Sequence, residues 1–98
     1  MTIEKKFNGE NLTIALTGRL DTTTAPDLEK EIQDSTKGIK SLTLDLKNLE
    51  YISSAGLRVV LGAQKLMSKQ GQMNLVNVSD AIKDIFEMTG FSEILNID

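Results

Sequence analysis

Large apolar residues alternate with small or polar ones in several stretches of this chain. The alternation is clearest in residues 12–17 (Leu-Thr-Ile-Ala-Leu-Thr) and 42–46 (Leu-Thr-Leu-Asp-Leu), and residues 72–78 form a further stretch of this kind. A period of two residues is typical of β-strands that bury one face. Residues 3–7 can form a short first strand. The turn-forming run 8–11, which contains Asn-Gly, predicts an antiparallel hairpin between the first two strands.

Helical spacing of apolar residues predicts two helices, over residues 25–35 and 55–69. Thr24 has Asp27 three residues later, which is a variant of the capping box and marks the start of the first helix. Gly71 ends the second helix. The apolar residues expected to face the core from these helices are Leu28, Ile32, Leu57, Val60, Leu61 and Met67.

A third helix is expected to begin after Ser79, which can cap it, with Ile82, Ile85 and Phe86 facing inward. Gly90 suits the left-handed position that follows such a helix. Residues 94–97 (Ile-Leu-Asn-Ile) then predict a short last strand.

From the second strand onward, strands and helices alternate, which predicts parallel pairing with right-handed crossovers. The strands place polar residues at every second position, where a sheet covered on both faces would read as continuous apolar runs. These exposed positions are Thr13, Thr17, Thr43, Asp45 and Asn74. We therefore expect an α/β fold with a mixed, mostly parallel sheet, an antiparallel N-terminal strand, and helices mainly on one face.

Composition narrows the function. The 98 residues suggest one domain, spanning residues 1–98, with 40% hydrophobic and 26% charged residues. Cysteine and histidine are both absent, which excludes disulfides, cysteine zinc sites and a Ser-His-Asp triad. A net charge of −3 and 4% aromatic residues argue against nucleic acid as a partner. No apolar run approaches bilayer length and no leader is evident. A cytoplasmic protein without cofactors or direct membrane insertion is expected, although docking to a membrane complex stays open.

The candidate chemistry lies where parallel strands end, because binding sites in open α/β sheets lie at the carboxyl ends of the strands. Two connections, residues 18–23 and 50–55, converge there. They bring together Asp21, Thr22, Thr23, Ser53 and Ser54. Ser53 or Ser54 can serve as an N-cap, or Ser54 can accept a phosphoryl group that the free amides of the helix start would bind. Gly56 can act in the same site or as a close-packing glycine.

Two cations on the second helix are candidate partner contacts. Arg58 lies four residues after Ser54, hence on the same side of the helix, and can meet a phosphate or a partner's carboxylate. Lys65 lies further along the exposed side of the helix. A lysine there also suits the negative end of the helix dipole, so both explanations stay open.

Residues 51–57 (Tyr-Ile-Ser-Ser-Ala-Gly-Leu) resemble the signature of STAS domains, in particular the bacterial anti-sigma factor antagonists. Residues 18–21 (Gly-Arg-Leu-Asp) resemble the Gly-x-Leu-Asp segment of that family, and residues 81–97 resemble its last helix and strand. The resemblance covers nearly the whole chain. It implies a small α/β domain that binds an anti-sigma factor, which is also a serine kinase of the GHKL type, and so releases a sigma factor to regulate transcription.

The same resemblance implies that the kinase inactivates the antagonist by phosphorylating a serine and that a PP2C-type phosphatase restores it. The acceptor position falls on Ser54, and Asp21 matches the family's carboxylate. Ser53 stands where many members have aspartate, which leaves Ser53 as an alternative acceptor. The candidate partner-binding residues are Asp21, Thr22, Thr23, Ser53, Ser54, Gly56, Arg58 and Lys65.

The function implied by the resemblance, in which phosphorylation controls which partner is bound (partner switching), is one of three candidates. The second is a STAS adaptor subunit of a transporter or sensory complex that is never phosphorylated. The third, an enzyme with Ser54 as nucleophile, is disfavoured because no adjacent histidine base exists and no Gly-x-Ser-x-Gly elbow is present. The oligomeric state stays open.

Overall fold

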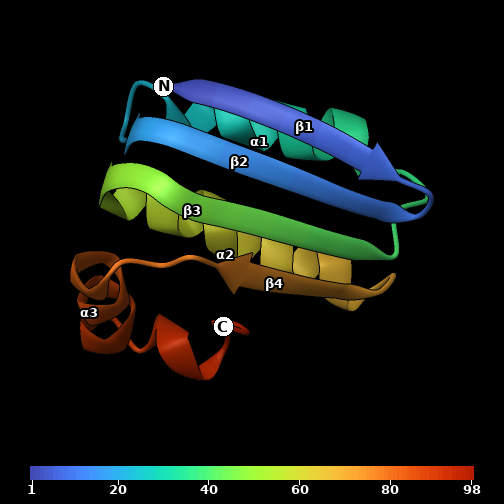
Figure 1. Ribbon diagram of the computed structural model, residues 1–98. Coiled ribbons are helices and arrows are strands. Elements are labelled where there is room, and N and C mark those ends of the chain that lie inside the picture. The colour runs from blue at the N-terminus through green and yellow to red at the C-terminus, as the bar shows by residue number, and fades with distance from the viewer.

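A computed structural model describes all 98 residues and shows a four-stranded sheet backed by helices (Figure 1). The strands are β1 (Thr2–Asn8), β2 (Asn11–Leu20), β3 (Ser41–Ile52) and β4 (Gln72–Val76), and they lie in this order across the sheet. β1 pairs with β2 in antiparallel register, whereas β2, β3 and β4 are parallel. The predicted hairpin and the predicted mixed sheet are confirmed.

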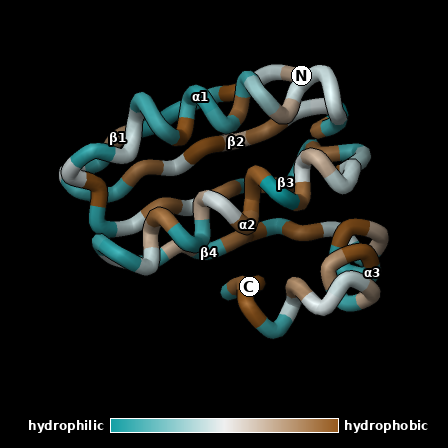
Figure 2. The backbone as a smooth tube through the Cα atoms, turned by 180° about the vertical axis from the view of Figure 1, so that it is seen from behind, coloured by the Kyte–Doolittle hydropathy of each residue, from teal (hydrophilic) through white to brown (hydrophobic).

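The two crossover helices lie on the same face of the sheet. They are α1 (Ala25–Ser35) and α2 (Ser54–Ser68), and Figure 2 shows both in front of the strands when the molecule is seen from behind. Each new strand is added beside the previous one, so the connections always step in the same direction. The third helix, α3 (Asp80–Met88), and the short 3₁₀ turn η1 (Phe91–Glu93) lie below β4 in Figure 1, beyond its carboxyl end.

The core fills the space between the sheet and the two crossover helices. Alternate strand residues supply it, as the period-two pattern predicted: Leu12, Ile14, Leu16, Leu42, Leu44, Leu46, Met73 and Leu75 are all at most 1% exposed. The opposite face of the sheet is polar, as expected. A hollow on that face is lined only by non-hydrophobic residues, among them Lys6, Thr13 and Thr43.

Both central strands are longer than the sequence predicts. β2 ends at Leu20 and β3 at Ile52, so residues 18–20 and 50–52, which were expected as parts of loops, belong to the strands. The register between the two strands shifts after Ala15 and again after Gly18, whose φ is 103°. These irregularities absorb the residues that break the alternating pattern, and the pairing then continues to the strand ends.

The helix boundaries agree closely with the predicted ones. β4 ends at Val76, two residues before the predicted end of that strand, and three other details were wrong. Thr24 precedes α1, yet its side chain makes no capping hydrogen bond to that helix. Leu61 is only partly buried, and Val59 and Ala63 face the core as well. The predicted last strand is reduced to a single bridge between Ile97 and Leu75.

The predictions for the third helix are confirmed. The Ser79 hydroxyl accepts a hydrogen bond from the Ile82 N–H at 3.3 Å and caps α3. Gly90 adopts φ 80° immediately before η1, in the left-handed region. Ile82 and Phe86 are buried, and Ile85 packs against the core from a partly buried position.

Candidate functional site

The carboxyl ends of β2 and β3 meet the first turn of α2 with almost no space between them. Leu20 and Ile52 pair at these strand ends, and Gly56 lies against both. A Cβ on residue 56 would lie 2.7 Å from Leu20 Cγ and 2.9 Å from Ile52 Cγ1. Only glycine lets the helix approach this closely, so the buried Gly56 acts as a close-packing residue that fixes the start of α2 on the sheet.

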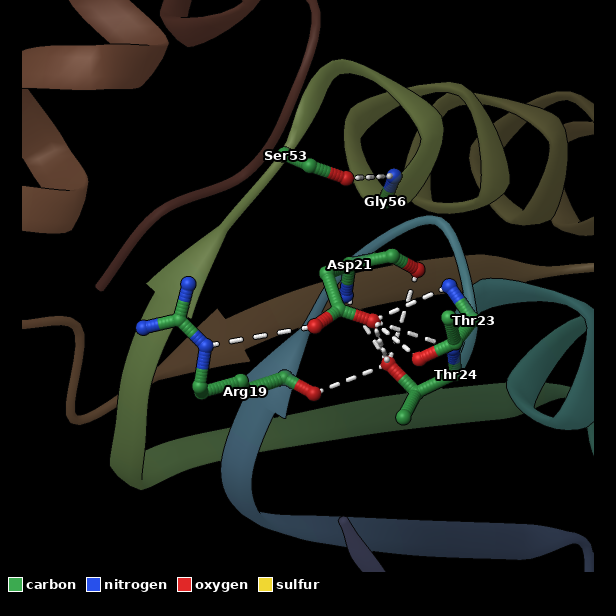
Figure 3. Close-up of polar contacts among 6 residues, drawn as sticks. All are labelled: Arg19, Asp21, Thr23, Thr24, Ser53 and Gly56. Carbon is green, nitrogen blue, oxygen red and sulfur yellow. Dashed lines mark hydrogen bonds and ion pairs between the residues drawn. The ribbon is translucent and has the colours of Figure 1, made fainter.

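The two serines of the junction differ in what their hydroxyl groups do. Ser53 is the N-cap of α2: its backbone is extended (φ −93°, ψ 174°), and its hydroxyl accepts a hydrogen bond from the Gly56 N–H at 3.2 Å (Figure 3). Its own N–H donates to the Leu20 carbonyl at 2.9 Å. Ser54 is the first helical residue, its side chain is exposed, and no hydrogen bond involves its hydroxyl. The cap and the free hydroxyl are therefore consecutive residues.

Asp21 organises the connection between β2 and α1. Its Oδ1 accepts hydrogen bonds from the Thr23 hydroxyl at 2.7 Å, the Thr23 N–H at 3.0 Å and the Thr24 N–H at 3.2 Å (Figure 3). The Thr23 hydroxyl is the main cause that lowers the pKa of Asp21 below its usual 3.8; partial desolvation opposes it, and the backbone amides add to it. Asp21 is thus a carboxylate at neutral pH, one residue beyond the Leu20 carbonyl that binds Ser53.

Thr24 ties the end of β2 to the start of α1. Its hydroxyl donates to the Arg19 carbonyl at 2.8 Å and accepts from the Asp21 N–H at 2.8 Å. The hydroxyl is engaged in these two bonds, and the Thr24 backbone is helical (φ −100°, ψ −20°) where an N-cap is typically extended, so the predicted capping box is absent.

A stacked pair that the sequence did not reveal lies beside this turn. The guanidinium of Arg19 sits over the Tyr51 ring at 4.3 Å from its centroid, and Arg19 Nε is 3.9 Å from Asp21 Oδ2. Arg19 and Tyr51 face each other in the β2–β3 register only because of the bulge after Gly18. Their sequence separation and the predicted loop gave no signal of this contact.

Arg58 and Thr22 share a shallow hollow of about 220 Å³ between the start of α1 and the first turns of α2. Arg58 is exposed and forms no ion pair within the molecule. Thr22 and Thr23 are also exposed. The structure thus brings Asp21, Thr22 and Thr23 to the same edge as the two serines.

Lys65 lies apart from this cluster. It borders a second hollow of about 310 Å³, further along the seam between α1 and α2, in the last turn of α2. Gly62 lines the same hollow. Gly62 was not among the predicted site residues, although a glycine in the middle of a predicted helix is a signal visible in the sequence.

No cluster of three or more acidic side chains that could hold a metal ion is present. The longest helix, α2, has 15 residues, and no helix combines the length and apolarity needed to cross a bilayer.

The sequence model of the STAS domain matches residues 2–98. The chain belongs to the STAS domain family. The fold and family that the residues around Ser54 suggested are therefore confirmed.

Curated relatives and a solved structure add to this assignment. BtrV of Bordetella bronchiseptica, provisionally named as an anti-sigma factor antagonist, is 39% identical over 88 residues, which cover 88% of this chain and 76% of that protein. The anti-sigma-B factor antagonist of Listeria monocytogenes is 34% identical over 96 residues, covering 95% and 83%. The solved structure of the Bacillus cell fate determinant SpoIIAA in its phosphorylated form superposes with a TM-score of 0.78 at 19% identity, covering 99% and 91%.

Proposed function

We propose that this STAS domain is an anti-sigma factor antagonist that works by partner switching. It binds an anti-sigma factor, which is a serine kinase of the GHKL type, and thereby frees a sigma factor. The kinase phosphorylates Ser54 and ends the interaction, and a PP2C-type phosphatase restores it. Family membership and the names of the two curated relatives support the antagonist function.

The observation that carries the phosphorylation step is the difference between Ser53 and Ser54. A kinase can reach the exposed Ser54 hydroxyl without breaking any hydrogen bond of the fold. The Ser53 hydroxyl is instead half-buried and already engaged as the N-cap of α2, so a kinase would have to break this hydrogen bond to reach it. Ser54 is therefore the acceptor that we favour over Ser53.

The surroundings of Ser54 suit an added phosphate. The first turn of α2 contains no acidic residue, and its free backbone amides and the helix dipole favour an anion there. Arg58, one turn along the same side, is a cation without an ion-pair partner. The phosphate brings roughly −1.5 to −2 charges, and the neighbouring Asp21 carboxylate adds to the negative field that a partner would meet.

The serine at position 53, where many members of the family have aspartate, still provides the helix cap. Serine and aspartate are both strong N-cap residues, since each places an oxygen where it accepts a hydrogen bond from the helix amides. Ser53 makes this bond. The fold needs a cap at position 53 and does not need it to be charged.

The test is phosphorylation by the purified anti-sigma factor kinase of the source genome in the presence of ATP. We expect one phosphate on the wild-type chain and on Ser53→Ala, and none on Ser54→Ala. Phosphate found on Ser53 would move the acceptor. If the kinase does not phosphorylate the chain, and the chain instead binds a membrane transporter or sensory complex, the adaptor function would be favoured over partner switching.

A phosphomimetic variant tests the consequence of the modification. Ser54→Asp is expected to weaken binding to the anti-sigma factor while leaving the free energy of unfolding within about 0.5 kcal/mol of wild type, as for other exposed positions. Isothermal titration and chemical denaturation measure the two quantities. A large loss of stability would show that the serine is mainly structural.

A further inference from the structure

Gly62 is a glycine that the fold does not require. It lies in the interior of α2, and a Cβ on it would meet no atom within 4 Å. By contrast, a Cβ on Gly56 or Gly71 would collide with neighbouring atoms. A glycine inside a helix is less favourable than alanine, so Gly62 lowers the stability of the helix without relieving any contact inside the molecule.

The missing side chain opens a hollow on the surface. This hollow, which we call the Gly62 groove, has a volume of about 310 Å³ and lies between α1 and α2. Its apolar lining residues are Ile32, Val59, Ala63 and Leu66. An engineered protein cavity of about 150 Å³ holds benzene, so the groove has room for one aromatic or branched side chain from another molecule.

The α2 rim of the groove is positively charged. Lys65 and Lys69 line it, and Arg58 lies in the adjoining hollow on the same side of the helix. All three are exposed and without an ion pair in the molecule. The sequence of α2 contains no aspartate or glutamate, although the whole chain has a net charge of −3. A binding segment that complements this rim is therefore acidic.

The groove is continuous with the surroundings of Ser54. Glu29 and Val59 line both the Gly62 groove and the smaller hollow that contains Arg58 and Thr22. A segment that contacts the first turn of α2 can therefore also reach the adjoining Gly62 groove along the seam between the two helices.

We infer that the anti-sigma factor inserts one large apolar side chain of an acidic segment into the Gly62 groove, with its carboxylates meeting Arg58, Lys65 and Lys69. This inference rests on the proposed antagonist function and specifies the chemistry of the partner. It also gives the phosphate on Ser54 two effects. The phosphate repels the acidic segment, and it competes with that segment for Arg58.

The test is isothermal titration of the chain with the purified anti-sigma factor of the source genome. Gly62→Leu fills the groove and is expected to weaken binding by about 30-fold or more, the loss typical of a blocked anchor. Ser68→Leu is the matched control, because it places the same side chain on an exposed position of α2 that does not line the groove. Lys65→Glu with Lys69→Glu is expected to weaken binding and its salt dependence, whereas Lys30→Glu on α1 is not.

Three outcomes separate the inference from the proposed function. Wild type that binds while Gly62→Leu binds equally well overturns the groove and leaves the antagonist function in place. Wild type that neither binds an anti-sigma factor nor becomes phosphorylated overturns both. If Gly62→Leu does not fold, the methyl resonances of Val59 and Ala63 in wild type decide: they must shift on binding, and unchanged resonances refute the inference.

Discussion

Replacing Gly56 and Gly62 by alanine should change stability in opposite directions, although the two glycines lie six residues apart in one helix. At position 56 the new Cβ would stand 2.7 Å from Leu20 Cγ, 2.9 Å from Ile52 Cγ1 and 3.0 Å from the Leu20 carbonyl oxygen. Either the first turn of α2 or the end of β2 must move. Such overpacking costs about 1–3 kcal/mol, and the better helix propensity of alanine returns at most about 1 kcal/mol. We expect a net loss of about 1–2 kcal/mol.

At position 62 the same methyl group enters open space. Only the backbone terms remain: alanine favours the helix and reduces the entropy of the unfolded chain. Gly62→Ala should therefore stabilise the domain by about 0.5–1 kcal/mol. The pair is its own control, because substitution, helix and method are identical.

Urea denaturation at neutral pH measures both free energies, and thermal unfolding checks them. In a domain of 60–100 residues, 1 kcal/mol shifts the Tm by roughly 4–8 °C. Gly56→Ala should therefore melt several degrees below wild type and Gly62→Ala a few degrees above it. A Gly56→Ala variant as stable as wild type would refute the close packing of α2 on the strand ends. A destabilised Gly62→Ala variant would show that the glycine has a role inside the fold.

Three further predictions concern the site and its support. Ser53→Ala should lower the free energy of unfolding by about 1 kcal/mol through loss of the N-cap, whereas Ser54→Ala should change it by less than about 0.5 kcal/mol, both by chemical denaturation. The pKa of Asp21 is lowered in the folded state, above all by the Thr23 hydroxyl. The carboxylate therefore stabilises the fold at pH values above its unfolded pKa near 3.8, and this contribution is lost as the pH falls through the lower folded pKa. Asp21→Asn should flatten the pH dependence of stability below pH 3.8, and an unchanged acid profile would contradict this. Gly71→Ala should destabilise the domain by about 3 kcal/mol, because the new Cβ would collide with the backbone carbonyl of Lys40. A Tm near that of wild type would show that the backbone around Lys40 and residue 71 can move apart.

The fold was readable from the sequence because local patterns and tertiary structure agree. The alternating leucines of residues 42–46 and the helical spacing around Leu28 and Ile32 gave the right elements and the right buried faces. The extension of β3 to Ile52 could not be read, because residues 47–51 do not alternate and a bulge is recognisable only once the partner strand is in place.

The site was only partly readable for a related reason. The sequence placed Ser53 and Ser54 at a helix start, but which of them is the cap depends on the exact residue at which the helix begins. Sequence patterns locate a helix boundary only to within a few residues. The stacking of Arg19 on Tyr51 depends on the shifted register between β2 and β3. Contacts across strands with irregular pairing leave no trace in the spacing of either residue.

The antiparallel first strand has a practical consequence for the protein's amino end. Since β1 runs antiparallel to β2, Met1 lies beside Gly18: a Cβ on Gly18 would be 3.6 Å from the Met1 Cα. Gly18 is two residues before Leu20, the last residue of β2. A purification tag or fluorescent protein fused ahead of Met1 would stand near the surface that includes Ser54. Its bulk would obstruct a partner there, and the weaker binding would be mistaken for an effect of the variant under test. Asp98 instead donates its N–H to the Leu75 carbonyl on β4, so fusions for pull-down or imaging belong at that end.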